Sequence, residues 1–178
     1  ALELFAEKGI QATTTREIAE RAGAAEGTLY RHFDGKDDLA NWLHERCADE
    51  LRDRLAAATD EAAAPAERLE ALVRGIFSFF AEKPTSCTYL LSTQDESADG
   101  ADSQASPAPL APFTDTIEAG MEAGVFEDVS ASLVAGWILS MVQRTVLFLK
   151  AEALPMGRQE AIDRTVAAAR RLVEAERM

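Results

Sequence analysis

The chain has few of the residues that build disulfide frameworks, metal centres and β-sheets. Its 178 residues include two cysteines and two histidines, and only 7% are aromatic. Cys47 and Cys87 lie far apart and have no CxxC spacing, so neither a disulfide framework nor a zinc site is indicated. His44 and Cys47 are close in sequence, but no third metal ligand stands near them. We therefore expect no metal, no cofactor and a fold built from helices rather than strands.

Basic residues are also scarce. Lysine and arginine number 18 against 31 acidic residues, which gives a net charge of -13. Affinity for a phosphate backbone comes from lysine and arginine, so this balance argues at first against a nucleic-acid partner. The acidity is uneven, however, because residues 1–46 carry a net charge of -3 and the remaining 132 residues carry -10. The total charge therefore does not exclude DNA binding by the first part of the chain.

Residues 13–36 predict a helix-turn-helix. Thr14 is suited to cap a helix and Glu17, three residues later, to complete a capping box. Gly23 ends that helix in a sharp turn, and a second helix is expected from Glu26 to Phe33. On this second helix Leu29 and Phe33, four residues apart, are expected to pack inward. Hydroxyl, guanidinium and imidazole groups then face outward, where they suit phosphates and base edges.

The same stretch resembles the DNA-binding signature of the TetR family. The matching residues are Thr14, Thr15, Ile18, Ala19, Ala22, Gly23, Gly27, Thr28, Leu29, Tyr30, His32, Phe33 and Lys36. The resemblance covers roughly residues 1–45. It implies a three-helix DNA-binding domain over residues 1–45 and a helical domain for ligand binding and dimerisation over residues 46–178. It also implies an all-α fold of about nine helices, a homodimer, and a basic N-terminal arm ahead of Ala1.

The resemblance assigns DNA contacts to residues of the two short helices and the turn between them. Glu26 departs from the lysine or serine that the family favours at its position, and it either points away from phosphate or accepts from a cytosine amino group. For Arg16 a backbone contact and a solvated surface position are equally open. The expected contacts are Thr15, Arg16, Ala25, Glu26, Gly27, Thr28, Tyr30, Arg31, His32 and Lys36.

Apolar residues at spacings of three and four predict the remaining helices. A long helix from Lys36 to about Thr59 is expected to link the two domains. The stretch 128–151 is apolar nearly all round, but Ser140, Gln143 and Arg144 interrupt it, so we expect burial on two sides rather than a membrane span. Residues 96–109 have no large apolar side chain and predict a mobile surface loop. The other expected helices span residues 65–83, 85–93, 110–124 and 158–176.

Two further sets of residues are candidates in the second domain. A ligand pocket is predicted at Phe77, Phe80, Thr88, Tyr89, Phe113, Ile117, Met121, Trp137, Met141 and Arg144, although any single apolar member is more commonly core. Arg144 has three possible partners, namely an acid of its own chain, an acid across the dimer, and an anionic effector. A dimer interface is predicted at Leu133, Trp137, Val142, Val146, Ile162, Val166, Leu172 and Val173.

We predict a cytoplasmic, DNA-binding transcriptional regulator. Within that class we favour a repressor that a small molecule releases from a pseudo-palindromic operator. An activator of the same family is one alternative. A helical interaction protein that has lost DNA affinity is another. An enzyme is disfavoured, because no Ser-His-Asp set, metal site or carboxylate pair is evident in the sequence.

Overall fold

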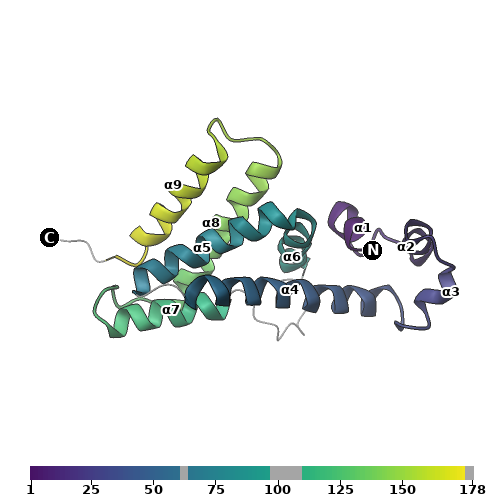
Figure 1. Ribbon diagram of the computed structural model, residues 1–178, viewed down its shortest axis with the longest axis horizontal. Helices are drawn as coiled ribbons and strands as arrows, with labels where there is room; N and C mark the ends of the chain where they lie inside the picture. The colour runs from purple at the N-terminus through teal and green to yellow at the C-terminus, as the bar shows by residue number, and fades with distance from the viewer. Residues whose placement is uncertain (61–63, 97–109, 175–178) are drawn as a thin grey trace. The chain divides into compact units, whose positions relative to one another are not determined.

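The computed structural model describes residues 1–60, 64–96 and 110–174, and within them the chain forms nine α-helices (Figure 1). The predicted all-α fold is confirmed. The predicted surface loop at 96–109 lies outside the described residues, except for Glu96. The helices are α1 (Leu2–Lys8), α2 (Thr15–Ala22), α3 (Glu26–Leu29), α4 (Lys36–Asp60), α5 (Pro65–Glu82), α6 (Pro84–Glu96), α7 (Leu110–Glu122), α8 (Ala131–Lys150) and α9 (Arg158–Arg171).

The contacts divide the chain into two compact units. Unit 1 contains residues 1–50 and α6, and unit 2 contains residues 51–82 together with α7, α8 and α9. The helix α4 contributes its first part to unit 1 and its last part to unit 2. The sequence predicted a boundary between residues 45 and 46. The contacts instead place α6 in the same unit as the first three helices.

Unit 1 is held together by the packing of α6 against α1 and α4. The ring of Tyr89, on α6, stacks on Phe5 of α1 with centroids 6.0 Å apart and meets His44 of α4 edge-on at 6.4 Å. Its hydroxyl donates a hydrogen bond of 2.9 Å to the carbonyl oxygen of Ala40. A tyrosine buried to this extent needs a partner for its hydroxyl, and a carbonyl of α4 supplies it.

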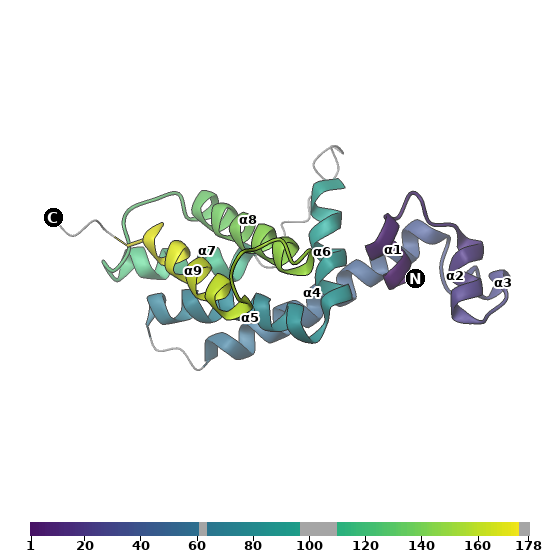
Figure 2. The same ribbon diagram turned by 90° about the horizontal axis from the view of Figure 1, so that it is seen from above.

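Unit 2 is built around α5. Helices α7, α8 and α9 all contact α5, and α8 also contacts α7 and α9 (Figure 2). The apolar stripe that predicts α5 in the sequence is buried along its length, and its members are Leu69, Leu72, Val73, Ile76, Phe77, Phe79 and Phe80. Arg74 pairs with Asp163 of α9 at 2.9 Å, at the partly exposed edge of this packing.

The segment after α7 closes unit 2. The backbone N–H groups of Val125 and Phe126 donate to the carbonyl of Gly120, and the N–H of Glu127 donates to the carbonyl of Val173. The ring of Phe126 lies where a side chain at position 120 would be, so only glycine fits there. Because residues 173 and 174 pair with this segment, α9 ends at Arg171 and the predicted extension to residue 176 is wrong over residues 172–174.

Candidate nucleic-acid interface

The helix α2 begins with the capping box that the sequence predicts. The N–H of Glu17 donates to Thr14 Oγ1 at 3.2 Å, and the N–H of Thr14 donates to Glu17 Oε2 at 2.9 Å. Lys8 also donates to the Glu17 carboxylate, at 2.5 Å, and this bond is the main reason why the pKa of Glu17 falls to about 2. Gly23 ends the helix with a left-handed φ of 64°, as predicted.

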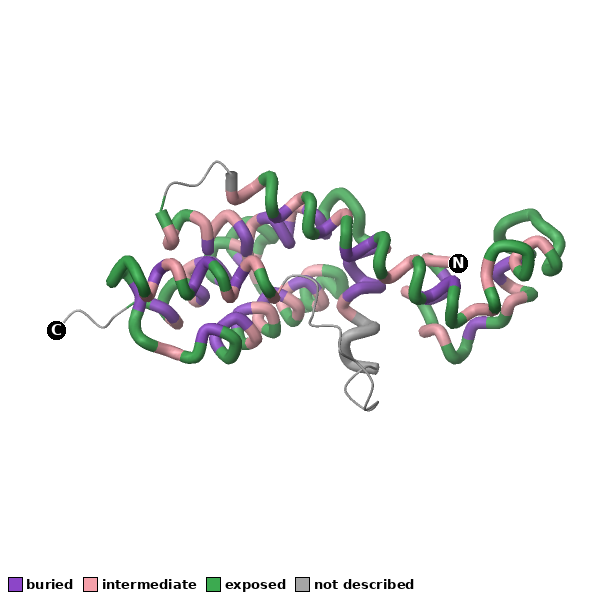
Figure 3. Tube along the Cα trace, turned by 90° about the horizontal axis from the view of Figure 1, so that it is seen from below, coloured by how far each residue is buried: buried purple, intermediate pink, exposed green. Residues whose placement is uncertain are grey.

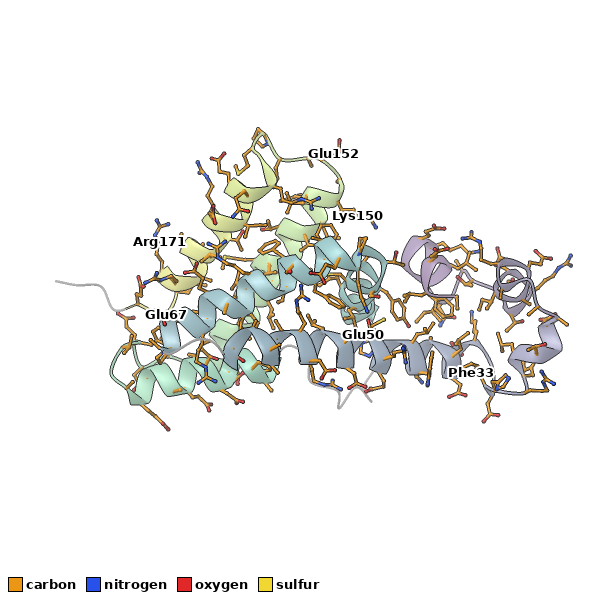
Figure 4. The ribbon with its side chains drawn as sticks, viewed as in Figure 1. Phe33, Glu50, Glu67, Lys150, Glu152 and Arg171 are labelled. Carbon is orange, nitrogen blue, oxygen red and sulfur yellow. The ribbon has the colours of Figure 1, made fainter. Side chains whose placement is uncertain are left out.

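The helix α3 is shorter than predicted. It spans Glu26–Leu29 rather than continuing to Phe33, and the chain then follows a tighter path in which Arg31 and His32 donate to carbonyls three residues back. Leu29 and Phe33 are half-buried rather than core residues, and Phe33 packs on Trp42 with ring centroids 5.7 Å apart. Figure 4 labels Phe33 near the beginning of α4. No residue of α3 is buried, and Figure 3 shows how exposed this part of the chain is.

Three of the predicted DNA contacts meet where α2 and α3 approach each other. The hydroxyl of Thr15, the first residue of α2, donates to Glu26, the first residue of α3, at 2.5 Å. The hydroxyl of Tyr30 lies 3.5 Å from Thr15 Oγ1, at the far limit of a hydrogen bond. Tyr30 is 55% exposed, so its ring is available to a partner. Without DNA, the Thr15 hydroxyl is therefore already hydrogen-bonded to the Glu26 carboxylate.

Most basic side chains of residues 1–46, all of which the structure describes, have partners within the chain. Arg16 pairs with Glu20 at 2.8 Å and Arg21 with Glu3 at 3.0 Å. Arg46 lies 5.7 Å from the ring of Trp42. Arg31 is exposed and makes no ion pair with the described residues, which leaves its guanidinium available for a phosphate.

Lys36 lies at the first turn of α4 and is only half-exposed. Its ammonium donates to the carbonyl oxygens of Ile10, Gln11 and Thr13 at 3.0, 3.0 and 3.2 Å. These bonds could not be predicted from local sequence, because their acceptors are main-chain atoms more than 20 positions away. A direct contact between Lys36 and DNA stays a prediction.

Three of the remaining predicted contacts, Ala25, Thr28 and His32, line an apolar hollow. Ala25, Gly27 and His32 are exposed, and Thr28 is half-buried. The hollow has a volume of about 180 Å³ and lies between α2, the turn, α3 and the start of α4. Its lining residues are Ile18, Ala19, Ala22, Ala24, Ala25, Thr28, Leu29, His32, Phe33 and Leu39.

The predicted ligand residues fall into two units and three environments. Thr88 and Tyr89 belong to unit 1, where Tyr89 is already engaged with Phe5 and Ala40. Trp137 is 50% exposed and Arg144 is exposed, so these two α8 side chains lie on the surface of the chain rather than in its interior. Met121 and Met141 are half-buried. The buried members in unit 2 are Phe77, Phe80, Phe113 and Ile117.

The predicted dimer residues divide into core and surface. Four of them are buried within their own chain, at 0–4% exposure: Val142, Val146, Val166 and Val173. Ile162 and Leu172 are half-buried, whereas Leu133 and Trp137 are half-exposed. Phe148 was not among the predicted interface residues, and it is 41% exposed on the same helix as Trp137. Its spacing from Trp137, eleven residues or three turns, was a usable signal.

The two cysteines are free thiols. Both are buried thiols, and burial raises the pKa of Cys47 and raises that of Cys87 to about 12. Among the described residues, no cluster of three or more His, Cys, Asp and Glu side chains is placed to hold a metal ion.

Comparison with known proteins identifies both parts of the chain. Residues 1–42 match the model of "Bacterial regulatory proteins, tetR family", and residues 62–147 match "Tetracyclin repressor-like, C-terminal domain". The HTH-type transcriptional repressor KstR2 of Mycobacterium tuberculosis is 40% identical over 77 residues, which are 43% of this chain and 38% of that protein. The HTH-type transcriptional activator FasR of Mycolicibacterium smegmatis is 36% identical over 83 residues, or 44% of this chain and 36% of that protein. The aligned stretch thus spans well under half of these curated relatives.

Solved structures match over nearly the whole chain. The ketosteroid transcriptional regulator KstR2 of Mycobacterium tuberculosis has a TM-score of 0.73 and 26% identity, covering 98% of this chain and 91% of that one. A regulatory protein of the tetR family from Rhodococcus RHA1 has a TM-score of 0.77 and 28% identity, covering 99% and 94%. The two family models, the helix-turn-helix and these structures agree, and the chain belongs to the tetR family of bacterial regulatory proteins.

Proposed function

We propose that the chain is a DNA-binding transcriptional regulator, acting in the cytoplasm as a repressor. The observation that carries this proposal is the exposed surface of α2, the turn and α3. The three residues that follow α3 are all exposed, namely Tyr30, Arg31, whose guanidinium has no ion pair among the described residues, and His32. Phosphate contacts from arginine and polar groups position a protein on DNA, and base-edge contacts in the major groove provide the specificity.

The proposed DNA contacts are those expected from the sequence, apart from Lys36, whose ammonium is already bonded to three loop carbonyls. Arg31 is a phosphate contact, because it is exposed and no carboxylate of the described residues competes for it. Thr15 and Tyr30 reach the DNA once the Glu26 carboxylate has moved, since that carboxylate now accepts the Thr15 hydroxyl hydrogen. Glu26 therefore points away from phosphate in the complex, or accepts from a cytosine amino group.

We further propose that the regulator is a homodimer that uses an exposed face of α8. Leu133, Trp137, Arg144 and Phe148 recur at spacings of four, seven and four, so they share one side of the helix. By length and composition alone α8 is also apolar enough to cross a membrane, and only 28% of that stretch is buried in the chain. A second copy of α8 and α9 covers this face without a membrane, and two-fold symmetry then presents two recognition surfaces to a pseudo-palindromic operator.

The effector that we propose is a mostly apolar small molecule bound in unit 2. Support comes from the aromatic and aliphatic side chains of α5 and α7, and from the description of the relative KstR2 as a ketosteroid regulator. An effector that prefers the DNA-free conformation weakens DNA binding by the same factor by which DNA weakens effector binding. A steroid is the first class of compound to test.

DNA binding is tested by selecting genomic fragments on the purified chain and measuring their affinity by fluorescence anisotropy at several salt concentrations. Affinity is expected to fall steeply with salt, and Arg31→Ala and Tyr30→Ala are expected to weaken it without unfolding the protein. Arg164→Ala removes the same charge from an exposed position in unit 2 and is expected to have no effect. Failure to retain any fragment would instead favour a helical interaction protein.

Effector action and the direction of regulation need a second experiment. Steroid compounds are screened by thermal shift, and each hit is titrated against the operator complex. Release of the operator supports the proposal, whereas an unchanged operator affinity at saturation excludes that compound as an effector. A reporter gene behind the operator distinguishes the two modes, because deletion of a repressor raises expression and deletion of an activator lowers it.

A further inference from the structure

The ammonium of Lys36 has a complete set of partners within the chain. A lysine carries three N–H donors and no acceptor, and here three carbonyl oxygens lie within 3.2 Å of Nζ. All three belong to the loop between α1 and α2, over residues 10–13. The compact, tetrahedral ammonium suits converging acceptors, whereas a planar guanidinium directs its donors outward as a fork.

This arrangement has no simple electrostatic explanation in α4 itself. The first turn of a helix carries the positive end of the helix dipole, where a cation is disfavoured and the neighbouring Asp37 and Asp38 are favoured. Lys36 makes no ion pair with a described carboxylate, and its charge is stabilised by the loop carbonyls instead. The presence of a lysine at this position is therefore explained by the loop carbonyls that it binds, and not by its place in α4.

The loop that Lys36 holds leads directly into α2. Thr13 is buried at 1% exposure, its hydroxyl donates to Gly9 at 2.8 Å, and its N–H donates to Ile10 at 3.1 Å. The next residue, Thr14, is the N-cap of α2. On the other side of the motif, the N–H of Asp34 donates to the Asp38 carboxylate at 3.0 Å and joins the segment after α3 to α4. Both ends of the helix-turn-helix are thus tied to the first turn of α4.

We propose that Lys36 is a positioning residue for DNA binding, which sets the orientation of α2 and α3 relative to α4 through the carbonyls of residues 10, 11 and 13 and makes no phosphate contact. This inference rests on the proposed DNA binding. It predicts that substitutions at Lys36 change operator affinity without changing the number of ions released on binding.

Two substitutions separate positioning from phosphate contact. Lys36→Arg keeps the charge and suits a phosphate at least as well as lysine, but it does not match three converging carbonyls. Lys36→Met removes the charge and keeps most of the stem. We expect both variants to weaken operator binding by about tenfold or more, because hydrogen bonds from a charged donor are lost. The matched control is Arg31→Met, which deletes an unpaired cation from the recognition surface.

The readout is the slope of log affinity against log salt concentration. Arg31→Met is expected to reduce the slope by about 0.9 per protomer, and Lys36→Met to leave it at the wild-type value. Full affinity in Lys36→Arg, or a slope reduced in Lys36→Met as in the control, overturns the proposal. So does a lower melting temperature with unchanged affinity of the folded protein, which indicates a purely structural role. If the wild type retains no DNA, the proposed function fails, and this inference fails with it.

A DNA-free measurement adds an independent test. The chain has four lysines, Lys8, Lys36, Lys83 and Lys150, so reductive methylation followed by mass spectrometry resolves each one. Lys36 is expected to react more slowly than the exposed Lys150, because its lone pair becomes available only after three hydrogen bonds break. Equal rates at the two lysines overturn the proposal.

Discussion

The exposed tryptophan of α8 gives the sharpest test of the proposed dimer. Trp137 is 50% exposed in the single chain. A tryptophan buries about 150–250 Å² in full, so half of it is about 100 Å². Covering that area contributes about 2.5 kcal/mol at 25 cal/mol per Å². A two-fold interface contains Trp137 from both protomers, so this contribution occurs twice. Trp137→Glu is therefore expected to weaken the free energy of dimerisation by about 5 kcal/mol, which raises the dimer dissociation constant more than about 10³-fold.

The measurement is sedimentation over a range of protein concentrations, and the chain supplies its own control. Trp42, on α4 in unit 1, is exposed to the same extent, at 49%, and its neighbour Arg46 would pair with a glutamate at position 42. Trp42→Glu is therefore expected to leave the dimer intact. With Trp42→Phe the only tryptophan left is Trp137, whose emission is expected to shift to shorter wavelength as the protein associates. A Trp137→Glu chain that still dimerises at wild-type concentrations refutes the proposed face.

Two further predictions concern stability. Gly120→Ala is expected to lower the free energy of unfolding by about 1–3 kcal/mol in urea titrations, because the new Cβ would lie 2.0 Å from the Phe126 ring; Gly136→Ala, whose Cβ meets nothing within 4 Å, is the control. The stability difference between wild type and Glu17→Gln is expected to be present above about pH 4.5 and to shrink as the pH falls toward 2, because the folded-state pKa of Glu17 is depressed to about 2. A difference that stays constant across this window would contradict the role given to Lys8 and Thr14.

The features that were predictable from sequence are local ones. The Thr14 capping box, the left-handed Gly23 and the long helix from Lys36 each follow from residues within a few positions of one another, and all three are present. The length of α3 was not predictable in this way. The sequence has no stop signal between Leu29 and Phe33, and the tighter bonds of Arg31 and His32 set the end of the helix.

In the second domain, the helices were easier to predict from the sequence than the side of each helix that is buried. The sequence identifies α8 as a helix, but apolar residues surround it, so periodicity does not distinguish the side that faces α5 from the side that faces solvent. Val142 and Val146 were predicted for the dimer interface and are buried in their own chain, whereas Phe148, which was not included in that prediction, is exposed. Tyr89 was assigned to a ligand pocket because it is an aromatic residue in an apolar pattern. Its partners, Phe5 and Ala40, are 84 and 49 positions away, and only the fold brings them together.

The distribution of partners among the cations explains how a chain of net charge -13 can still present a DNA-binding surface. Exposed ion pairs contribute little to stability, so the Arg16–Glu20 pair, with side chains 80% and 62% exposed, is easily exchanged for a contact with phosphate. The Lys36 ammonium is different, because moving it to a phosphate would leave three loop carbonyls without their donor. Arg31 needs no exchange at all. The energetic order in which these groups become available to DNA is therefore Arg31, then Arg16, then Lys36, and this order differs from the equal weight that motif matching gives them.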